Sequence, residues 1–168
     1  IQHYFDSKQD LVHAGCRAMV EGAAEAHEQR TDALEPLAAL TELLIQPIPR
    51  SDAFRLGSAV WYAYLAQTVT DPQIAEIIGG ASRETFEYAA SLLRSAGAPA
   101  PAHEAARLVA LSNGLAQSVL IGALSPDRAT ETLRNEIASL RAAVNSTDAD
   151  AGRPAPSTPS AWTSSAQE

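Results

Sequence analysis

The chain has 168 residues, a net charge of -8 from 12 Lys and Arg against 20 Asp and Glu, and one cysteine. This length fits one globular domain with a sizeable core, and a single cysteine excludes an intramolecular disulfide framework and fits a reducing compartment. The acidity argues against nucleic-acid binding by this chain alone, because phosphate backbones need a basic surface, and no run of about 18 apolar residues predicts a membrane span.

Apolar residues recur at helical spacing from Lys8 to Val144, which predicts an all-α fold of about six helices. The first helix begins at overlapping capping signals in residues 6–10 and lasts to about Arg30. A short amphipathic helix follows, and Gln46-Pro47-Ile48-Pro49 ends it because two prolines so close forbid its continuation. This second helix carries Leu37, Leu40, Leu43 and Leu44.

Ser51 can cap the third helix, whose apolar residues cover more than one face, so this helix is predicted to be central in the bundle. Asp71-Pro72 is typical of an N-cap followed by proline in the first helical position, and it begins the fourth helix. Gly79-Gly80 in the middle of that helix predicts a kink or a local break. Residues 97–101 end it.

Two helices remain, roughly 103–123 and 126–144, and the Leu124-Ser125 joint between them is so short that they form a predicted antiparallel hairpin. Residues 145–168 are rich in Pro, Gly, Ser and Thr, and they lack Val, Ile, Leu, Met and Phe. Such a segment cannot bury enough apolar surface to order itself, so a disordered tail is expected.

Reactive constellations of the common enzyme classes are missing from the sequence. His27-Glu28 and His103-Glu104 each begin a zinc motif that no second histidine completes, and the Asp10 and His13 pair has no second copy on another helix. These groups are interpreted as solvated helix-face side chains, and Cys16 as a buried small hydrophobe, with a redox-sensing thiol as the alternative. No enzymatic activity, metal or cofactor is expected.

The opening segment, Ile1-Gln2-His3-Tyr4-Phe5-Asp6-Ser7-Lys8-Gln9-Asp10-Leu11-Val12, is the most informative. It resembles the end of the DNA-binding head of TetR-family transcriptional regulators and the start of their fourth helix, in the form found in the BetI-type branch. Trp61, the Thr70-Asp71-Pro72 junction and Asn113-Gly114-Leu115 are similar to the BetI-type C-terminal regulatory domain, and the resemblance covers about residues 1–144. Gln2 and Asn113 depart from the family pattern, which often has an aromatic residue and Asp there.

The resemblance implies three parts. Residues 1–7 would be the remnant of a helix-turn-helix head, residues 8–144 the ligand-binding and dimerisation domain, and residues 145–168 the disordered tail. It also implies that His3, Tyr4 and Lys8 contact DNA phosphates. The alternative is that Tyr4 and Phe5 only pack the head against the body, and for Phe5 we favour this alternative. The chain begins with Ile and has no signal-peptide pattern, so we expect a cytoplasmic protein whose DNA-binding head lies mostly before Ile1.

The family's ligand pocket lies inside the helical body, and the candidates here combine aromatic walls with amides that could orient a small molecule. They are Trp61, Tyr64, Leu65, Phe86, Asn113 and Gln117. The alternative is that Trp61 and Phe86 are ordinary core residues.

The last two helices offer a second expectation, because Gly114, Ser118 and Gly122 recur every four residues and leave a groove for another helix. We expect two hairpins to meet across a two-fold axis as a four-helix bundle, with packing inside one chain as the alternative. The predicted interface consists of Leu111, Gly114, Leu115, Ser118, Val119, Gly122, Leu133, Ile137 and Leu140.

These observations favour a ligand-responsive transcriptional regulator, a repressor, that acts as a homodimer and binds operator DNA only as an intact protein. The alternatives are a helical small-molecule-binding or enzymatic bundle without a DNA partner, and a stand-alone dimerisation module.

Overall fold

The computed structural model describes residues 7–151, and over this range the chain is all-helical, as predicted. The helices are α1 (Lys8–Thr31), α2 (Pro36–Ile45), α3 (Asp52–Gln67), α4 (Pro72–Ser95), α5 (Pro101–Leu120) and α6 (Pro126–Ala151). Among these residues no helix has the length and apolar character that crossing a membrane requires.

α1, α3, α4 and α6 begin where the sequence places capping residues, whereas Glu35 before α2 and Ala100 before α5 form no side-chain cap. Ser7 accepts a hydrogen bond from the N–H of Asp10 at 3.1 Å, and Ser51 and Asp71 cap α3 and α4 in the same way. Ser125 accepts a hydrogen bond from a backbone N–H in the first turn of α6. Each cap satisfies N–H groups that have no partner inside the helix, so these starts are fixed by a few neighbouring residues.

Two glycines with positive φ end α4 and α5. Gly97 has φ 77°, and the N–H of Ala98 donates to the carbonyl of Leu93 at 2.9 Å. Gly122 has φ 79° and closes α5 with the same bond pattern. A residue without a side chain adopts this left-handed conformation at no steric cost, so the sharp turn into α6 already requires glycine at position 122.

The course of two helices differs from the prediction. α4 passes through Gly79 and Gly80 as one continuous helix, so the predicted local break is absent from it. Ile74 and Ile78 are buried on the inner face of α4. The packing of these side chains outweighs the loss of helix stability, which is roughly 1 kcal/mol for each glycine. α6 continues past Val144 to Ala151, since extending a formed helix is easy until Gly152 and Pro154 follow in the sequence.

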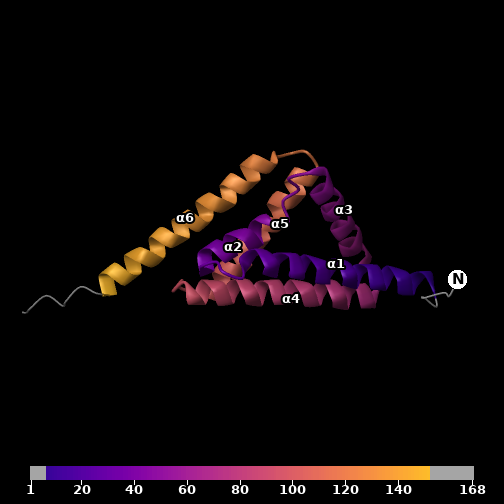
Figure 1. Ribbon diagram of the computed structural model, residues 1–168, viewed down its shortest axis with the longest axis horizontal. Coiled ribbons are helices and arrows are strands. Elements are labelled where there is room, and N and C mark those ends of the chain that lie inside the picture. Colours follow the sequence, from indigo (N-terminus) through magenta and orange to yellow (C-terminus); the bar gives the residue numbers. More distant parts are fainter. Residues whose placement is uncertain (1–6, 152–168) are drawn as a thin grey trace, which may run out of the picture.

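Figure 1 shows α1 and α4 side by side, with α3 and α6 on opposite sides of the molecule and α2 and α5 between them. The main core joins α2, α4, α5 and α6. Its largest fully buried side chains include Leu40, Leu44, Ile48, Leu93, Leu108 and Leu133. Burying one such side chain stabilises the fold by about 1.5–3 kcal/mol, so this cluster supplies most of the driving force for folding.

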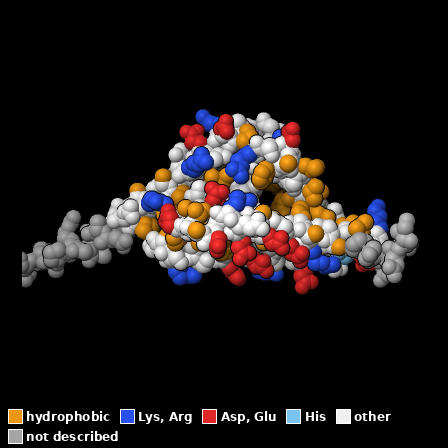
Figure 2. Space-filling view, in the orientation of Figure 1, with side chains coloured by type: hydrophobic (Ala, Val, Ile, Leu, Met, Phe, Trp, Pro, Cys, Tyr) orange, Lys and Arg blue, Asp and Glu red, His pale blue; other side chains and the backbone are white. Residues whose placement is uncertain are grey.

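The prediction of a central third helix is wrong. α3 lies at the edge of the bundle, packs on α4 and α5, and has no buried residue in the part of the chain that the structure describes. Its apolar residues point in several directions, but only one side of the helix has neighbours. Leu56 and Val69 expose 68% and 86% of their surface, and hydrophobic atoms gather over α3 in Figure 2.

Candidate ligand-binding and coupling site

A small second apolar cluster connects α1, α3 and α4. Cys16 of α1 and Ile74 and Ile78 of α4 are buried at its centre, and Trp61 and Tyr64 of α3 pack against them half-buried. Two of the predicted ligand-binding residues are therefore brought together. They lie on the least buried helix, where a small shift of α3 would change the space beside them.

Tyr64 also reaches across to α1. A Cβ atom at Gly15 would lie 2.8 Å from the hydroxyl oxygen of Tyr64, which is closer than real Cβ atoms come to other atoms. Because glycine has no side chain, the ring of Tyr64 on α3 can pack directly against α1 at position 15. The Tyr64 hydroxyl is therefore a point of close contact between α3 and α1.

Cys16 has the role predicted for it as a buried small hydrophobe. Its surface is fully covered, and burial raises the pKa of its thiol, while Arg17 lowers this pKa and Asp71 raises it. A thiol with a raised pKa is mostly protonated at neutral pH and is a poor nucleophile, which argues against the redox-sensing alternative.

Asp71 connects the beginning of α1 to the beginning of α4. Its Oδ1 accepts the backbone N–H groups that cap α4, at 3.0 and 3.2 Å, and its Oδ2 accepts hydrogen bonds from His13 Nε2 at 2.8 Å and Gln9 Nε2 at 3.2 Å. His13 is buried and Asp71 is mostly covered. One carboxylate therefore caps α4 and also bonds two side chains of α1, so it connects the beginnings of the two helices.

The hydrogen bonds around Asp71 hold its pKa at about 2, below the ordinary value of 3.8. The bond from His13 is the largest cause, opposed by desolvation, and the N–H of Ile74, Gln9 and the N–H of Gln73 lower the pKa further. Because hydrogen bonds to the ionised form favour it, Asp71 carries a full negative charge at neutral pH next to the second apolar cluster.

Both histidines of α1 were predicted to lie on a solvated helix face, and this prediction is wrong. His13 and His27 expose 5% and 7% of their surface. They are fourteen residues apart, about four turns, so both face α4, where His27 meets the ring of Tyr88 edge-on at 5.6 Å. His103 is exposed, as predicted.

The other predicted ligand-binding residues lie farther out. Leu65 and Phe86 expose 42% and 37% of their surface, and Asn113 and Gln117 are exposed on α5. The backbone carbonyl of Asn113 accepts a hydrogen bond from the hydroxyl of Tyr62 at 3.1 Å, which connects α5 to α3. Among residues 7–151, the second apolar cluster does not include the side chains of these four residues.

The residues predicted for a dimer interface divide into two groups. The first group is buried in the core of a single chain, where α2, α5 and α6 pack together, and is not open to a partner. It consists of Val119, Leu133, Ile137 and Leu140. Leu111, Leu115 and Ser118 are half-buried, and Gly114 and Gly122 are exposed. A Cβ atom at Gly114 would meet no other atom within 4 Å.

The predicted DNA-contacting residues lie at the beginning of the chain. Lys8 is exposed in the first turn of α1, where its side chain can reach solvent or a partner. His3 and Tyr4 lie outside the described residues, as does Phe5. α1 therefore runs from this end of the molecule past the His13–Asp71 hydrogen bond to the contact with Tyr88.

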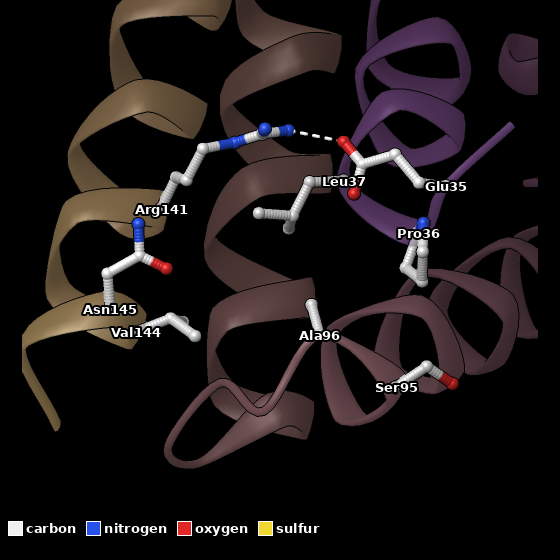
Figure 3. A pocket seen from close by; sticks show the side chains of 8 residues that line it. All are labelled: Glu35, Pro36, Leu37, Ser95, Ala96, Arg141, Val144 and Asn145. Atoms are coloured by element: carbon white, nitrogen blue, oxygen red, sulfur yellow. Dashed lines mark hydrogen bonds and ion pairs between the residues drawn. The ribbon is translucent and has the colours of Figure 1, made fainter. Parts of the chain in front are cut away.

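Two surface pockets lie elsewhere. The first has a volume of about 260 Å³ and is shown in Figure 3, where Arg141 of α6 forms an ion pair with Glu35 beside Leu37, Ala96 and Val144. The second has a volume of about 430 Å³ and lies at the end of α1, where it is lined by His27, Glu28, Thr31, Asp32 and Tyr88. Neither pocket contains a predicted ligand-binding residue.

The pair formed by His13 and Asp71 and the burial of His27 were not predicted from the sequence. A signal was present, because His13, Cys16, Val20 and His27 follow one another at helical spacing along one face of α1. Because Cys16 and Val20 are apolar, this face could have been predicted to be buried, and both histidines with it. No group of three or more potential metal ligands is found among the residues with described positions.

Residues 36–142 match the family model described as "BetI-type transcriptional repressor, C-terminal". A transcriptional regulator from Rhodococcus sp. Rha1 shares the fold with a TM-score of 0.75 and 23% identity, over 83% of this chain and 75% of that chain. A transcriptional regulator from Saccharomonospora viridis, solved in complex with choline, has a TM-score of 0.74 and 22% identity over 80% and 74% of the two chains. No curated protein matches the sequence significantly.

Proposed function

This chain belongs to the TetR family of transcriptional regulators, in its BetI-type branch, and we propose that it forms the ligand-responsive and dimer-forming domain of a repressor without enzymatic activity. The observation that carries the proposal is the position of α1. In the family, the DNA-binding head ends directly before this helix. Asp71 connects the helix to α4, and the contact at Gly15 connects it to α3. A change at α3 or α4 is thereby passed to α1.

The effector-binding site in this proposal is the space beside Trp61 and Tyr64, between α1, α3 and α4. α3 is weakly packed, and elements that move on ligand binding are drawn from such regions of low local stability. A ligand against these rings would displace α3 and, through Tyr64, push on α1 at Gly15. Further ligand contacts are proposed at Leu65, Phe86, Asn113 and Gln117.

The electrostatics favour a small organic cation as the effector. Aromatic faces attract cations, and the ionised Asp71 lies close enough to influence the pKa of Cys16 in the same cluster. The related Saccharomonospora viridis regulator was solved with choline, whose quaternary ammonium group has this chemistry. Choline is therefore the first compound to test.

The test is isothermal titration of this chain with choline, repeated with Trp61→Ala and with Phe54→Ala as a matched control. Phe54 lies on the same helix two turns earlier and is exposed, and it stacks with Arg50 instead of packing on the second apolar cluster. We expect Trp61→Ala to weaken binding by about tenfold or more, as the loss of a desolvated cation–π contact implies, and Phe54→Ala to leave it unchanged. Equal loss in both variants would contradict the proposed site.

We further propose that two copies associate through α5 and α6, in the cytoplasm. The exposed part of the predicted interface supports this arrangement, since Gly114 has open space around it and Leu111, Leu115 and Ser118 are only half-buried in one chain. A small-residue face permits close approach of a second helix pair, as in four-helix bundles. Ile121, at the end of α5, exposes 71% of its surface and extends the same apolar face.

Light scattering after size-exclusion chromatography tests the dimer. Ser118→Leu fills the groove and should raise the dissociation constant of the dimer by about tenfold or more, because overpacking at an interface costs on the order of 1–3 kcal/mol. Ser91→Leu is the control, since Ser91 is also half-buried and also bonds a carbonyl of its own helix. A monomer before any substitution would reject the proposal.

For DNA binding we propose that His3, Tyr4 and Lys8 contact phosphates of the operator. The measurement is operator affinity as a function of salt for the full-length gene product. Lys8→Ala should lower the salt slope by about one, because one phosphate contact is removed. An unchanged slope and affinity would exclude Lys8 from the contact.

A further inference from the structure

Hydrogen bonds from one face of α3 attach this helix to its neighbours. α3 has no buried residue in the part of the chain that the structure describes, so its packing contributes little hydrophobic stabilisation. Three of its side chains donate to backbone carbonyls of other segments. They are Arg55, Ser58 and Tyr62, which follow one another three and four residues apart, the spacing of a single helix face. Ser58 bonds the carbonyl of Pro47, in the loop after α2, at 3.2 Å.

The other two bonds join α3 to α5 at matched positions. Nη2 of Arg55 donates to the carbonyl of Leu120 at 2.7 Å, and the hydroxyl of Tyr62 donates to the carbonyl of Asn113 at 3.1 Å. The two donors are seven residues apart on α3, and so are the two acceptors on α5, which is about 10.5 Å along each helix. The helices run in opposite directions here, and Figure 1 shows the beginning of α3 next to the end of α5. α3 is thus held to α5 at two points.

The carbonyl of Leu120 needs a donor from outside its own helix. Leu120 is the last residue of α5, and the last four carbonyls of a helix have no partner inside it. The negative end of the helix dipole lies there and attracts a cation, yet the last turn of α5 contains no basic residue. Arg55 supplies that cation from α3. A charged donor bonds more strongly than a neutral one, so we expect Arg55 to hold α3 more firmly than Tyr62 does.

We propose that Arg55 is a positioning residue that holds α3 in its resting place against α5. This role rests on the repressor function proposed above, in which the effector displaces α3. The bond to Leu120 stabilises α3 where it lies without an effector. A ligand that requires the displaced position binds with an apparent affinity reduced by the fraction of molecules in which α3 stays in place. Loss of the bond therefore raises effector affinity, whereas loss of a residue that only supports the fold or the site lowers it.

Amide hydrogen exchange of this chain without ligand tests the hold on α3. Arg55→Met keeps the unbranched stem and removes the donor, and because the bond is exposed to solvent we expect exchange of the α3 amides to rise by about threefold to tenfold. The amides of α2 and α4 should keep their rates. Arg55→Lys retains a charged donor and should restore part of the protection. Unchanged exchange in α3, or an equal rise in α2 and α4, would overturn the proposal.

Isothermal titration with choline tests the connection to the effector. Arg55→Met should bind choline about threefold to tenfold more tightly than the unchanged chain. Arg94→Met is the matched control, since Arg94 is an exposed positive charge in the last turn of α4 and its loss changes the net charge equally. The control should leave both α3 exchange and choline affinity as they are. Equal or weaker choline binding by Arg55→Met would reject the positioning role.

The two measurements separate failure of this role from failure of the proposed function. If the unchanged chain does not bind choline, the proposed effector chemistry is wrong, and the exchange rates alone decide whether Arg55 holds α3. If choline binds and Trp61→Ala weakens the binding, the effector site stands. A choline affinity that Arg55→Met fails to raise then rejects only the role of Arg55.

Discussion

Replacing Gly15 by alanine sets two opposed effects against each other at the contact between α1 and α3. Alanine in the middle of a helix is favoured over glycine by about 1 kcal/mol. The new Cβ would lie 2.8 Å from the Tyr64 hydroxyl, however, and displacing a packed ring costs about 1–3 kcal/mol. We expect Gly15→Ala to change the free energy of unfolding by between about 0 and -2 kcal/mol, a neutral to destabilising result.

Two companion variants separate the terms. Gly22→Ala is on the same helix, and a Cβ there meets no atom within 4 Å, so it should show the helix-propensity gain of about 1 kcal/mol alone. Tyr64→Phe removes the hydroxyl and leaves the ring. In the Tyr64→Phe background, Gly15→Ala should therefore stabilise the protein by nearly the same amount as Gly22→Ala.

The assay is urea denaturation of the single and double variants, analysed as a double-mutant cycle at constant m-value. The structure predicts a coupling energy between Gly15→Ala and Tyr64→Phe of about 1 kcal/mol or more. If Gly15→Ala stabilises the protein as much as Gly22→Ala while Tyr64 is intact, α3 does not rest on α1 in this way. The proposed route from the effector to α1 would then be refuted.

Three further predictions concern buried polar groups. His13→Leu removes the main cause of the low pKa of Asp71, so this pKa should rise from about 2 toward 3.8 in an NMR titration. Burial lowers the pKa of His27 below 6.5 in the folded state. The contribution of His27 to the free energy of unfolding is therefore present above pH 6.5 and is lost as the pH falls below that value. Denaturation at several pH values measures this loss of stability. Ser112→Ala removes a buried 2.6 Å hydrogen bond to the carbonyl of Leu44 and should cost about 1–3 kcal/mol in urea denaturation.

Each of these has a control and a contradicting outcome. An Asp71 pKa that stays near 2 without His13 would show that the backbone caps alone hold it. His27→Leu should flatten the pH dependence near 6.5, and His103→Leu should not, since His103 is exposed. Ser118→Ala breaks only a bond within its own helix and should cost less than Ser112→Ala, which disconnects α5 from α2.

The starts of the helices were predictable because their causes lie within a few residues. Ser51 and the Asp71-Pro72 pair satisfy N–H groups three residues ahead or fewer, whatever the rest of the chain does. The opening segment and the BetI-like features likewise identified the family, which the match over residues 36–142 bears out. Trp61 and Tyr64 were found as neighbours because they are one turn apart on one helix.

The position of α3 was not predictable from its own residues. Apolar side chains around a helix are compatible both with a central place and with a helix that stands at an edge and exposes them, and the neighbours decide between the two. In the same way, the α1 histidines resemble ordinary helix-face residues until α4 is placed against them. Gly79 and Gly80 weaken α4 locally, yet the burial of Ile74 and Ile78 keeps it continuous.

The sequence by itself determined the helices, the caps of α1, α3, α4 and α6, and the family, because hydrogen bonds at helix ends and helical spacing are local properties. The tertiary structure alone decided that Asp71 joins α1 to α4, that Tyr64 touches α1 at Gly15, and that His27 is buried beside a pocket. These contacts join residues far apart in the chain, and they form only when packing of the main core brings the helices together.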